Sequence, residues 1–338
     1  MLRMLMVCCA LAMPTAGLAL PIPEVVADAV EGHILPRYGQ LVQDADTLAQ
    51  VAQDACGPTD TVLIAAFHDA FDAWISVSHI TFGPAEVDGR AFALAFWPDT
   101  RGMTGRSLSG LIANEDPVVG DPADYATVSV AARGFHALDF LLFDPQVSVA
   151  GDGAYRCALV QAITTDIAQM ARAIQEDWTE GFANLMRTAG SNERFQSPEE
   201  AARALFSALT TGLEFTADLR IGRPMGSFDA PRPNRAEARR SGRSLRHVEL
   251  SLEALADLAR ILSQDYPELQ AQLTDQFDTA LDRARTLDDP VFAGVADPSG
   301  RLRIEVLQQR IRDARALAAT DLGPTLGVAA GFNSLDGD

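Results

Sequence analysis

Residues 245–262 read LRHVELSLEALADLARIL, and this stretch predicts the fold class more clearly than any other part of the chain. Its apolar residues recur at steps of three and four, which is the spacing of one face of an α-helix in a bundle. The positions of that stripe are Leu245, Val248, Leu252, Leu255, Ala259 and Leu262. The stretch therefore predicts an amphipathic helix that packs its apolar side against other helices.

The same periodicity appears on both sides of this segment. Phe67, Phe71 and Trp74 share one helical face within residues 59–80, and another stripe runs from Leu159 to Trp178. In the second half, stripes of the same kind contain Leu205, Leu209 and Leu213; Leu269, Leu273, Phe277 and Leu281; and Ile304, Leu307, Ile311 and Ala314. Ser197-Pro198-Glu199-Glu200 has the pattern of a capping box with proline at the first helical position.

The remaining segments carry weaker signals. Residues 24–55 predict a helix pair interrupted at Pro36, and residues 124–143 predict one more helix. Residues 82–122 are rich in glycine and proline, and Phe92, Leu94 and Phe96 alternate with alanines, which allows one short strand. Residues 222–243 predict a long ordered loop of the kind that is often functional.

These patterns predict an all-α protein of two helical bundles packed together, with long ordered loops and at most a short strand. The first bundle is expected at approximately 24–190 and the second at 191–338.

The N-terminal 19 residues have the pattern of a secretory signal peptide. Arg3 supplies the positive start, an uncharged apolar run follows, and small residues at Gly17 and Ala19 suit cleavage after Ala19. We therefore expect a periplasmic or otherwise exported protein. Because no later apolar run reaches about 18 uncharged residues, no membrane span is expected in the mature chain.

Composition excludes several partners and chemistries. The formal net charge is −19, and such a surface would repel a phosphate backbone, so nucleic acid is not an expected partner. Cations and metal ions would be attracted. All 27 basic residues are arginine, which excludes a Schiff-base lysine and the lysine of a phosphate-binding loop.

The mature chain would keep two of the four cysteines, Cys56 and Cys157. In an oxidising compartment they are candidates for one disulfide, and two separate buried thiols are the alternative.

The most suggestive chemistry lies in Arg133-Gly134-Phe135-His136-Ala137-Leu138-Asp139. His136 and Asp139 are three residues apart and would project from one face of a helix. An imidazole and a carboxylate suit zinc, iron or manganese, but two ligands do not complete a metal site, and the pair could simply hydrogen-bond other helices. His68 and Asp72, four residues apart, form a second and weaker pair.

The segment Gly134-Phe135-His136-Ala137-Leu138-Asp139 resembles the Gly-x-His-x-x-Glu signature of imelysin-like proteins. Other stretches are similar to the same family: His33-Ile34-Leu35-Pro36, Phe71-Asp72-Ala73-Trp74, Phe96-Trp97-Pro98-Asp99, Ser241-Gly242-Arg243-Ser244-Leu245 and the tail from Gly331 to Asp338. The resemblance spans roughly residues 24–338, with Asp139 standing where the family has glutamate.

The resemblance implies an exported protein of two helical bundles, classed with metallopeptidases and tied in several members to iron uptake. It implies His136 and Asp139 as metal ligands. His68, Asp72 and Asp99 are weaker candidates that the resemblance does not itself assign. The metal would be a divalent ion or iron, and the partners would be that ion or other components of iron uptake. Because the aspartate side chain is one methylene shorter than glutamate, a site shaped for glutamate would need another ligand or a bridging water.

Two alternatives to a metal-binding or accessory role stay open. The first is a metallopeptidase of the imelysin type, which would need a metal-bound water and a general base. The second is a non-catalytic interaction module, in which the motif holds helices together.

Overall fold

The computed structural model describes residues 22–328. The expected signal peptide at 1–19 and the tail from Gly331 to Asp338 lie outside the described residues. The prediction of an all-α fold is confirmed: within residues 22–328 the only strand-like pairing is an isolated bridge between Ser227 and Ala230.

The first bundle is built from three long helical rods. Their segments are α1 (Ile22–Ala29), η1 (Val30–Ile34), α2 (Leu35–Asp54), α3 (Thr61–Val77), α8 (Gly153–Asp177), η6 (Trp178–Phe182) and α9 (Ala183–Arg187). Pro36 does not interrupt the first rod as predicted. It occupies the first turn of α2, directly after the π-helical segment η1, where its missing N–H and fixed φ are tolerated.

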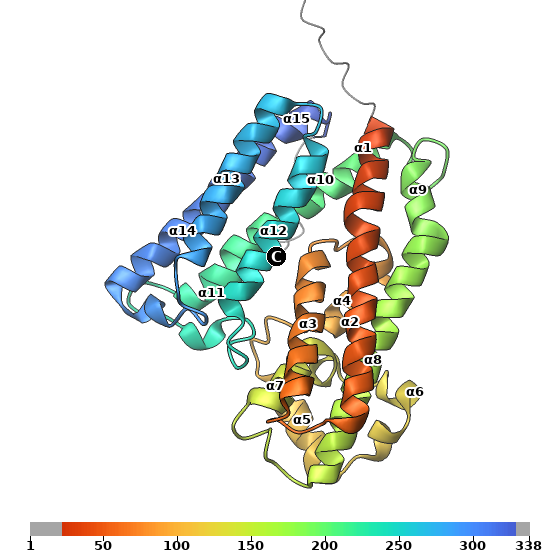
Figure 1. Ribbon diagram of the computed structural model, residues 1–338, viewed down its shortest axis with the longest axis vertical. Coiled ribbons are helices and arrows are strands. Elements are labelled where there is room, and N and C mark those ends of the chain that lie inside the picture. Colours follow the sequence, from red (N-terminus) through yellow and green to blue (C-terminus); the bar gives the residue numbers. More distant parts are fainter. Residues whose placement is uncertain (1–21, 329–338) are drawn as a thin grey trace, which may run out of the picture.

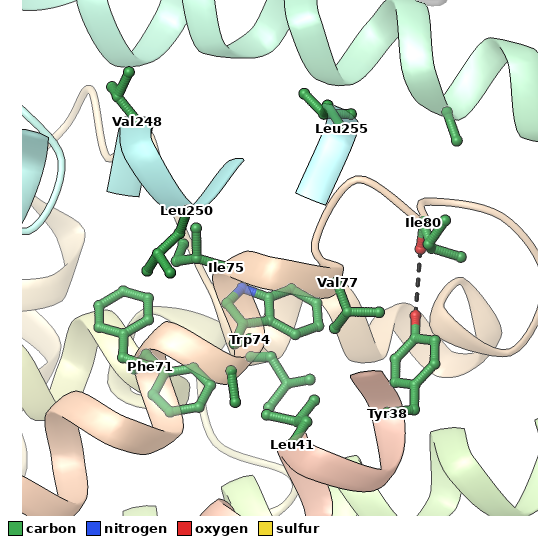
Figure 2. Close-up of a cluster of buried hydrophobic side chains, with 14 of the residues drawn as sticks. Tyr38, Leu41, Phe71, Trp74, Ile75, Val77, Ile80, Val248, Leu250 and Leu255 are labelled. Carbon is green, nitrogen blue, oxygen red and sulfur yellow. Dashed lines mark hydrogen bonds between the residues drawn. The ribbon is translucent and has the colours of Figure 1, made fainter. Parts of the chain in front are cut away.

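Helix α3 lies at the centre of the molecule. Asp60 caps its N-terminus by accepting the backbone N–H groups of Val62 (3.0 Å) and Leu63 (3.4 Å). Figure 2 shows the apolar side chains of α3, among them Trp74 and Ile75, between residues of α2 and Leu250 of α12.

The segment between α3 and α8 is more helical than predicted. It contains α4 (Arg90–Leu94), α5 (Met103–Asn114), α6 (Pro122–Tyr125) and α7 (Gly134–Phe143), joined by short 3₁₀ turns. The single helix predicted over 124–143 is therefore wrong in its first half. The chain leaves the helical conformation there, at Ser129 and Arg133, before α7 begins at Gly134 with a positive φ of 71°.

The short strand predicted around Phe92, Leu94 and Phe96 is not formed. Arg90–Leu94 is helical, with Gly89 in the left-handed conformation just before it. Alternation over five residues does not separate a strand from one helical turn, and no neighbouring strand in the described chain is available to pair with it.

The second bundle follows the loop after α9. Its segments are α10 (Pro198–Glu214), η7 (Phe215–Ile221), α11 (Gly222–Met225), α12 (Ser244–Leu262), α13 (Pro267–Arg285), α14 (Pro298–Leu317), η10 (Ala318–Leu322) and α15 (Gly323–Thr325). The capping box predicted before α10 forms in part. Ser197 is the N-cap but its side chain makes no capping bond, whereas Glu200 accepts the backbone N–H of Gln196 (2.6 Å).

The two bundles meet along α12. In Figure 1, α13 and α14 lie on one side of the molecule, α2 and α8 on the other, and α12 and α3 between them. Every residue of the predicted stripe in α12 is buried, and the helix packs against both α3 and α10, so the apolar core is continuous across the boundary. Within residues 22–328, no helix has the length and apolar character needed to cross a membrane.

Candidate functional site at the meeting of the two bundles

The start of α7 is fixed by close backbone packing. Gly134 lies so near α4 that a Cβ added to it would be 2.1 Å from the carbonyl oxygen of Ala93. The preceding Arg133 forms a two-pronged ion pair with Asp166 of α8, with N–O distances of 2.9 and 2.7 Å. Together these contacts set the direction in which the next turn of α7 points.

His136 lies in that turn and is buried among aromatic rings. Its ring meets Phe71 edge-on at 5.3 Å between centroids, and Trp97 lies 6.5 Å away. Its Nε2 is buried and has no hydrogen-bond partner in residues 22–328. Oε1 of Glu237 lies 3.8 Å away, which is too far for a hydrogen bond. The atom that would bind a metal or a ligand is thus not used by the described chain.

Glu237 and His247 were not among the predicted site residues, and the structure brings both to His136. Oε2 of Glu237 accepts hydrogen bonds from Nε of Arg220 (2.7 Å) and from Nδ1 of His247 (3.2 Å). Burial opposes ionisation of Glu237, but the Arg220 guanidinium and the neighbouring imidazoles hold the pKa of its carboxyl well below its usual range. The only sequence signal for Glu237 was its place in the loop 222–243.

Asp139 lies one turn after His136 and faces the same loop. Its Oδ1 accepts the backbone N–H of Ser241 at 3.2 Å. Burial raises the pKa of this carboxyl above its usual value, because no cation contacts it closely enough to offset the lost hydration. The shorter aspartate is therefore held by the loop between η7 and α12.

A polar pocket of about 230 Å³ opens beside these two residues. His136 and Asp139 line it together with Trp97, Asp99 and four arginines: Arg223, Arg235, Arg239 and Arg240. Arg240 is paired with Asp144 (2.7 Å) and lies over the ring of Phe140.

The other three arginines of the pocket, Arg223, Arg235 and Arg239, form no ion pair with any residue of 22–328. The Nε atoms of Arg223 and Arg239 are buried without a hydrogen-bond partner. Burial and the nearby charge of Arg235 lower the pKa of Arg223. The pocket is therefore a cationic surface in a chain whose net charge is −19.

Of the weaker candidates, only Asp99 reaches this pocket. It accepts the backbone N–H groups of Met103 (2.9 Å) and Thr104 (2.8 Å) and so holds the start of α5. Asp72 is paired with Arg243 and Arg246, and His68 stacks on Phe143 with its Nε2 buried and unpartnered. His68 and Asp72 do not line the pocket of His136.

The side chains around His136 do not by themselves form a site for a bare metal ion. Within the described chain there is no group of three or more histidine, cysteine, aspartate or glutamate side chains that could hold one. Glu237 is a further carboxylate near His136, but its Oε2 already accepts hydrogen bonds from Arg220 and His247. A metal at His136 and Asp139 would need its remaining ligands from a bound molecule.

Away from the pocket, Cys56 and Cys157 form a disulfide that links the end of α2 to the start of α8. The sequence had left this pairing open.

Comparison with known proteins gives one family and one fold. The family model described as imelysin matches residues 34–318. "Iron-regulated protein A" of Synechococcus elongatus is 24% identical over 307 residues, which cover 83% of this chain and 80% of that protein.

Two solved structures share the fold. An imelysin-like protein from Psychrobacter arcticum superposes with a TM-score of 0.78 and 18% identity, covering 92% of this chain and 97% of the other. An iron-regulated protein A precursor from Parabacteroides distasonis gives a TM-score of 0.73 and 13% identity, with coverage of 90% and 96%. At these identities the likeness concerns the fold.

Proposed function

This chain belongs to the imelysin family, and on that premise we propose that it is an exported binding or accessory protein in iron acquisition. Its ligand site is the pocket between Trp97 and the loop 222–243, and His136 and Asp139 are the side chains that reach the metal. The names of its relatives, which describe iron-regulated proteins, support the link to iron.

The observation that carries the proposal is the group of three arginines that have no acidic partner among residues 22–328. The chain has 46 acidic and 27 basic residues, so most arginines can find a carboxylate. Arg223, Arg235 and Arg239 instead converge on one pocket, where their mutual repulsion is a cost to the folded protein. A guanidinium presents a planar fork that matches a carboxylate or a phosphate, so the pocket suits a small polyanion.

In this proposal the protein binds iron as a complex with a small anion that supplies most of the metal ligands. A hydroxycarboxylate complex of iron is an anion with hard oxygen ligands, and its free carboxylates suit the arginines. The unpartnered Nε2 of His136 and the carboxylate of Asp139 lie where they could contribute the remaining contacts. This arrangement agrees with the small number of metal ligands that the described chain itself supplies.

The test is calorimetric titration of untagged protein with ferric citrate, with citrate alone, and with iron or zinc salts. We expect citrate and ferric citrate to bind, and Arg239→Ala to weaken both by about 10- to 100-fold, the range for a charge-assisted hydrogen bond. Arg232→Ala is the matched control, because Arg232 lies in the same loop and does not line the pocket. His136→Ala should weaken ferric citrate and leave citrate unchanged.

Three results would count against the proposal. The first is that neither anion binds, and the second is that Arg232→Ala weakens binding as much as Arg239→Ala does. The third is that wild type and His136→Ala bind ferric citrate equally, which would exclude His136 as a metal ligand. Protease assays with and without a chelator test the alternative: cleavage that both a chelator and His136→Ala abolish would make the chain a metallopeptidase instead.

A further inference from the structure

A second cavity, separate from the arginine pocket, lies between the two bundles. Its volume is about 330 Å³, within the range of small-molecule sites. Its lining is mainly apolar and comes from both bundles: Trp74, Ala95 and Phe92 from the first, and Phe215 and Leu255 from the second. The ring of Phe92 is 54% exposed.

Two residues that line this cavity carry a polar atom without a partner in residues 22–328. Nδ1 of His79 and Oγ of Ser251 are both buried and make no hydrogen bond there, and their residues are only 7% and 4% exposed. Buried polar groups in native proteins are almost always hydrogen-bonded, so each of these atoms calls for a partner from outside the described residues. Two charged residues also line the cavity, Arg220 and Glu237, and they form an ion pair with each other.

A chain of hydrogen bonds decides what kind of partner His79 needs. Oδ2 of Asp257 lies 2.9 Å from Nδ1 of His33, and Nε2 of His33 lies 2.8 Å from Nε2 of His79. Asp257 is also paired with Arg37 and Arg260, which keep it a carboxylate and therefore an acceptor only. His33 must then carry its proton on Nδ1, which leaves its Nε2 as the acceptor.

The same logic continues to the cavity. His79 must donate from Nε2 to His33, so its own Nδ1 carries a lone pair and no proton. Burial supports this neutral state, because it lowers the pKa of His33 and holds the pKa of His79 well below its usual value. His79, which lines the cavity, therefore carries an unused hydrogen-bond acceptor in apolar surroundings.

Each bundle has a π-helical segment connected with this cavity. Phe215 and Arg220, which line it, lie in η7, and His33, which contacts the lining residue His79, lies in η1. Such segments inside longer helices are uncommon and frequently occur at functional sites.

We propose that this cavity binds a small, neutral, largely apolar molecule with one hydrogen-bond donor, such as a phenol or an indole. The ligand donates a hydrogen bond to Nδ1 of His79, and the hydroxyl-bearing Ser251 lines the same cavity. A neutral ligand fits because the cavity's only ionic groups neutralise each other. This site takes a different ligand from the arginine pocket, and Trp97 forms part of the wall of both.

The experiment compares 2-naphthol with 2-methoxynaphthalene, which has nearly the same shape but lacks the donor hydroxyl. Titration of the wild-type protein should show 2-naphthol binding about tenfold more tightly, as expected for one buried hydrogen bond. His79→Leu should reduce this preference to about one. Ala95→Trp, which fills the cavity, should abolish binding of both compounds, and Arg239→Ala should change neither.

The comparison of the two compounds on wild-type protein does not depend on whether any variant folds. The proposal is overturned if 2-naphthol does not bind, if the two compounds bind equally, if binding survives Ala95→Trp, or if folded His79→Leu keeps the preference. Because citrate binding depends on Arg239 and naphthol binding on His79 and Ala95, the two sites can fail independently.

Discussion

At the scale of single residues, aromatic packing positions the polar chemistry. The ring of Phe71 stacks on Phe135 at 4.8 Å and meets the rings of His136 and His247 edge-on. Phe71 was predicted as a core residue of a helical face, and it is one. Its contacts with two histidines depend on α7 and α12 both packing near α3, which no local pattern encodes.

The buried pair of His33 and His79 should make the stability of the protein depend on pH. The folded pKa of His79 lies well below that of the unfolded chain, so the unfolded state binds more protons and stability falls as pH drops below about 6.5. The charges facing His79 are Arg37 and Arg220, with Asp257 beyond His33. Acidification from pH 7 to pH 5 should therefore lower the free energy of unfolding, because His79 takes up its proton only when the protein unfolds.

Urea unfolding of wild type and His79→Leu at the two pH values measures this contribution. The variant should lose less unfolding free energy than wild type on acidification, whatever its stability at pH 7. An equal loss in both proteins would show that His79 takes up a proton in the folded state.

At the scale of elements, the position of α7 depends on one glycine. Gly134 has a φ of 71° and sits against the carbonyl groups of Ala93 and Leu94. A side chain there must displace α4 or α7, whereas Gly110, inside α5, has open space around the position of a Cβ. The two glycines make a matched pair, because one is required by packing and the other is not.

Gly134→Ala should therefore destabilise the protein by about 3 kcal/mol or more, through backbone strain and a steric clash. Gly110→Ala should stabilise it by about 0.5–1 kcal/mol, since alanine favours a helix interior. Chemical denaturation measures both values. Similar effects of the two substitutions would mean that α7 can shift without cost.

At the scale of the whole molecule, a covalent link and a continuous core hold the parts together. The disulfide joins residues 101 positions apart, and both belong to the first bundle. Helix α12 belongs to the second bundle by sequence and packs against α3 of the first. The arginine pocket and the apolar cavity both lie where these bundles meet, so their ligands would contact residues from both halves of the chain.

Removal of the disulfide should lower stability substantially. Closing a loop of about 100 residues restricts the unfolded chain by about 4.7 kcal/mol in the entropy model, and measured losses are typically about 2–5 kcal/mol. The variant Cys56→Ser/Cys157→Ser should therefore unfold at lower urea concentration, and reduced wild type should match it. Equal midpoints for the oxidised protein and the variant would contradict the expected stabilisation.

The amino-acid sequence by itself determined the fold class, the long helices and the pair His136 and Asp139, because a helical period and a short motif are local properties. It misplaced the segment 82–143, where positive φ angles and 3₁₀ turns break up weak periodicity. Only the tertiary structure decided the composition of the sites. Glu237 lies near His136 although they are 101 positions apart in sequence, and His33 contacts His79 across 46 positions. Helix packing, and not spacing along the chain, sets those distances.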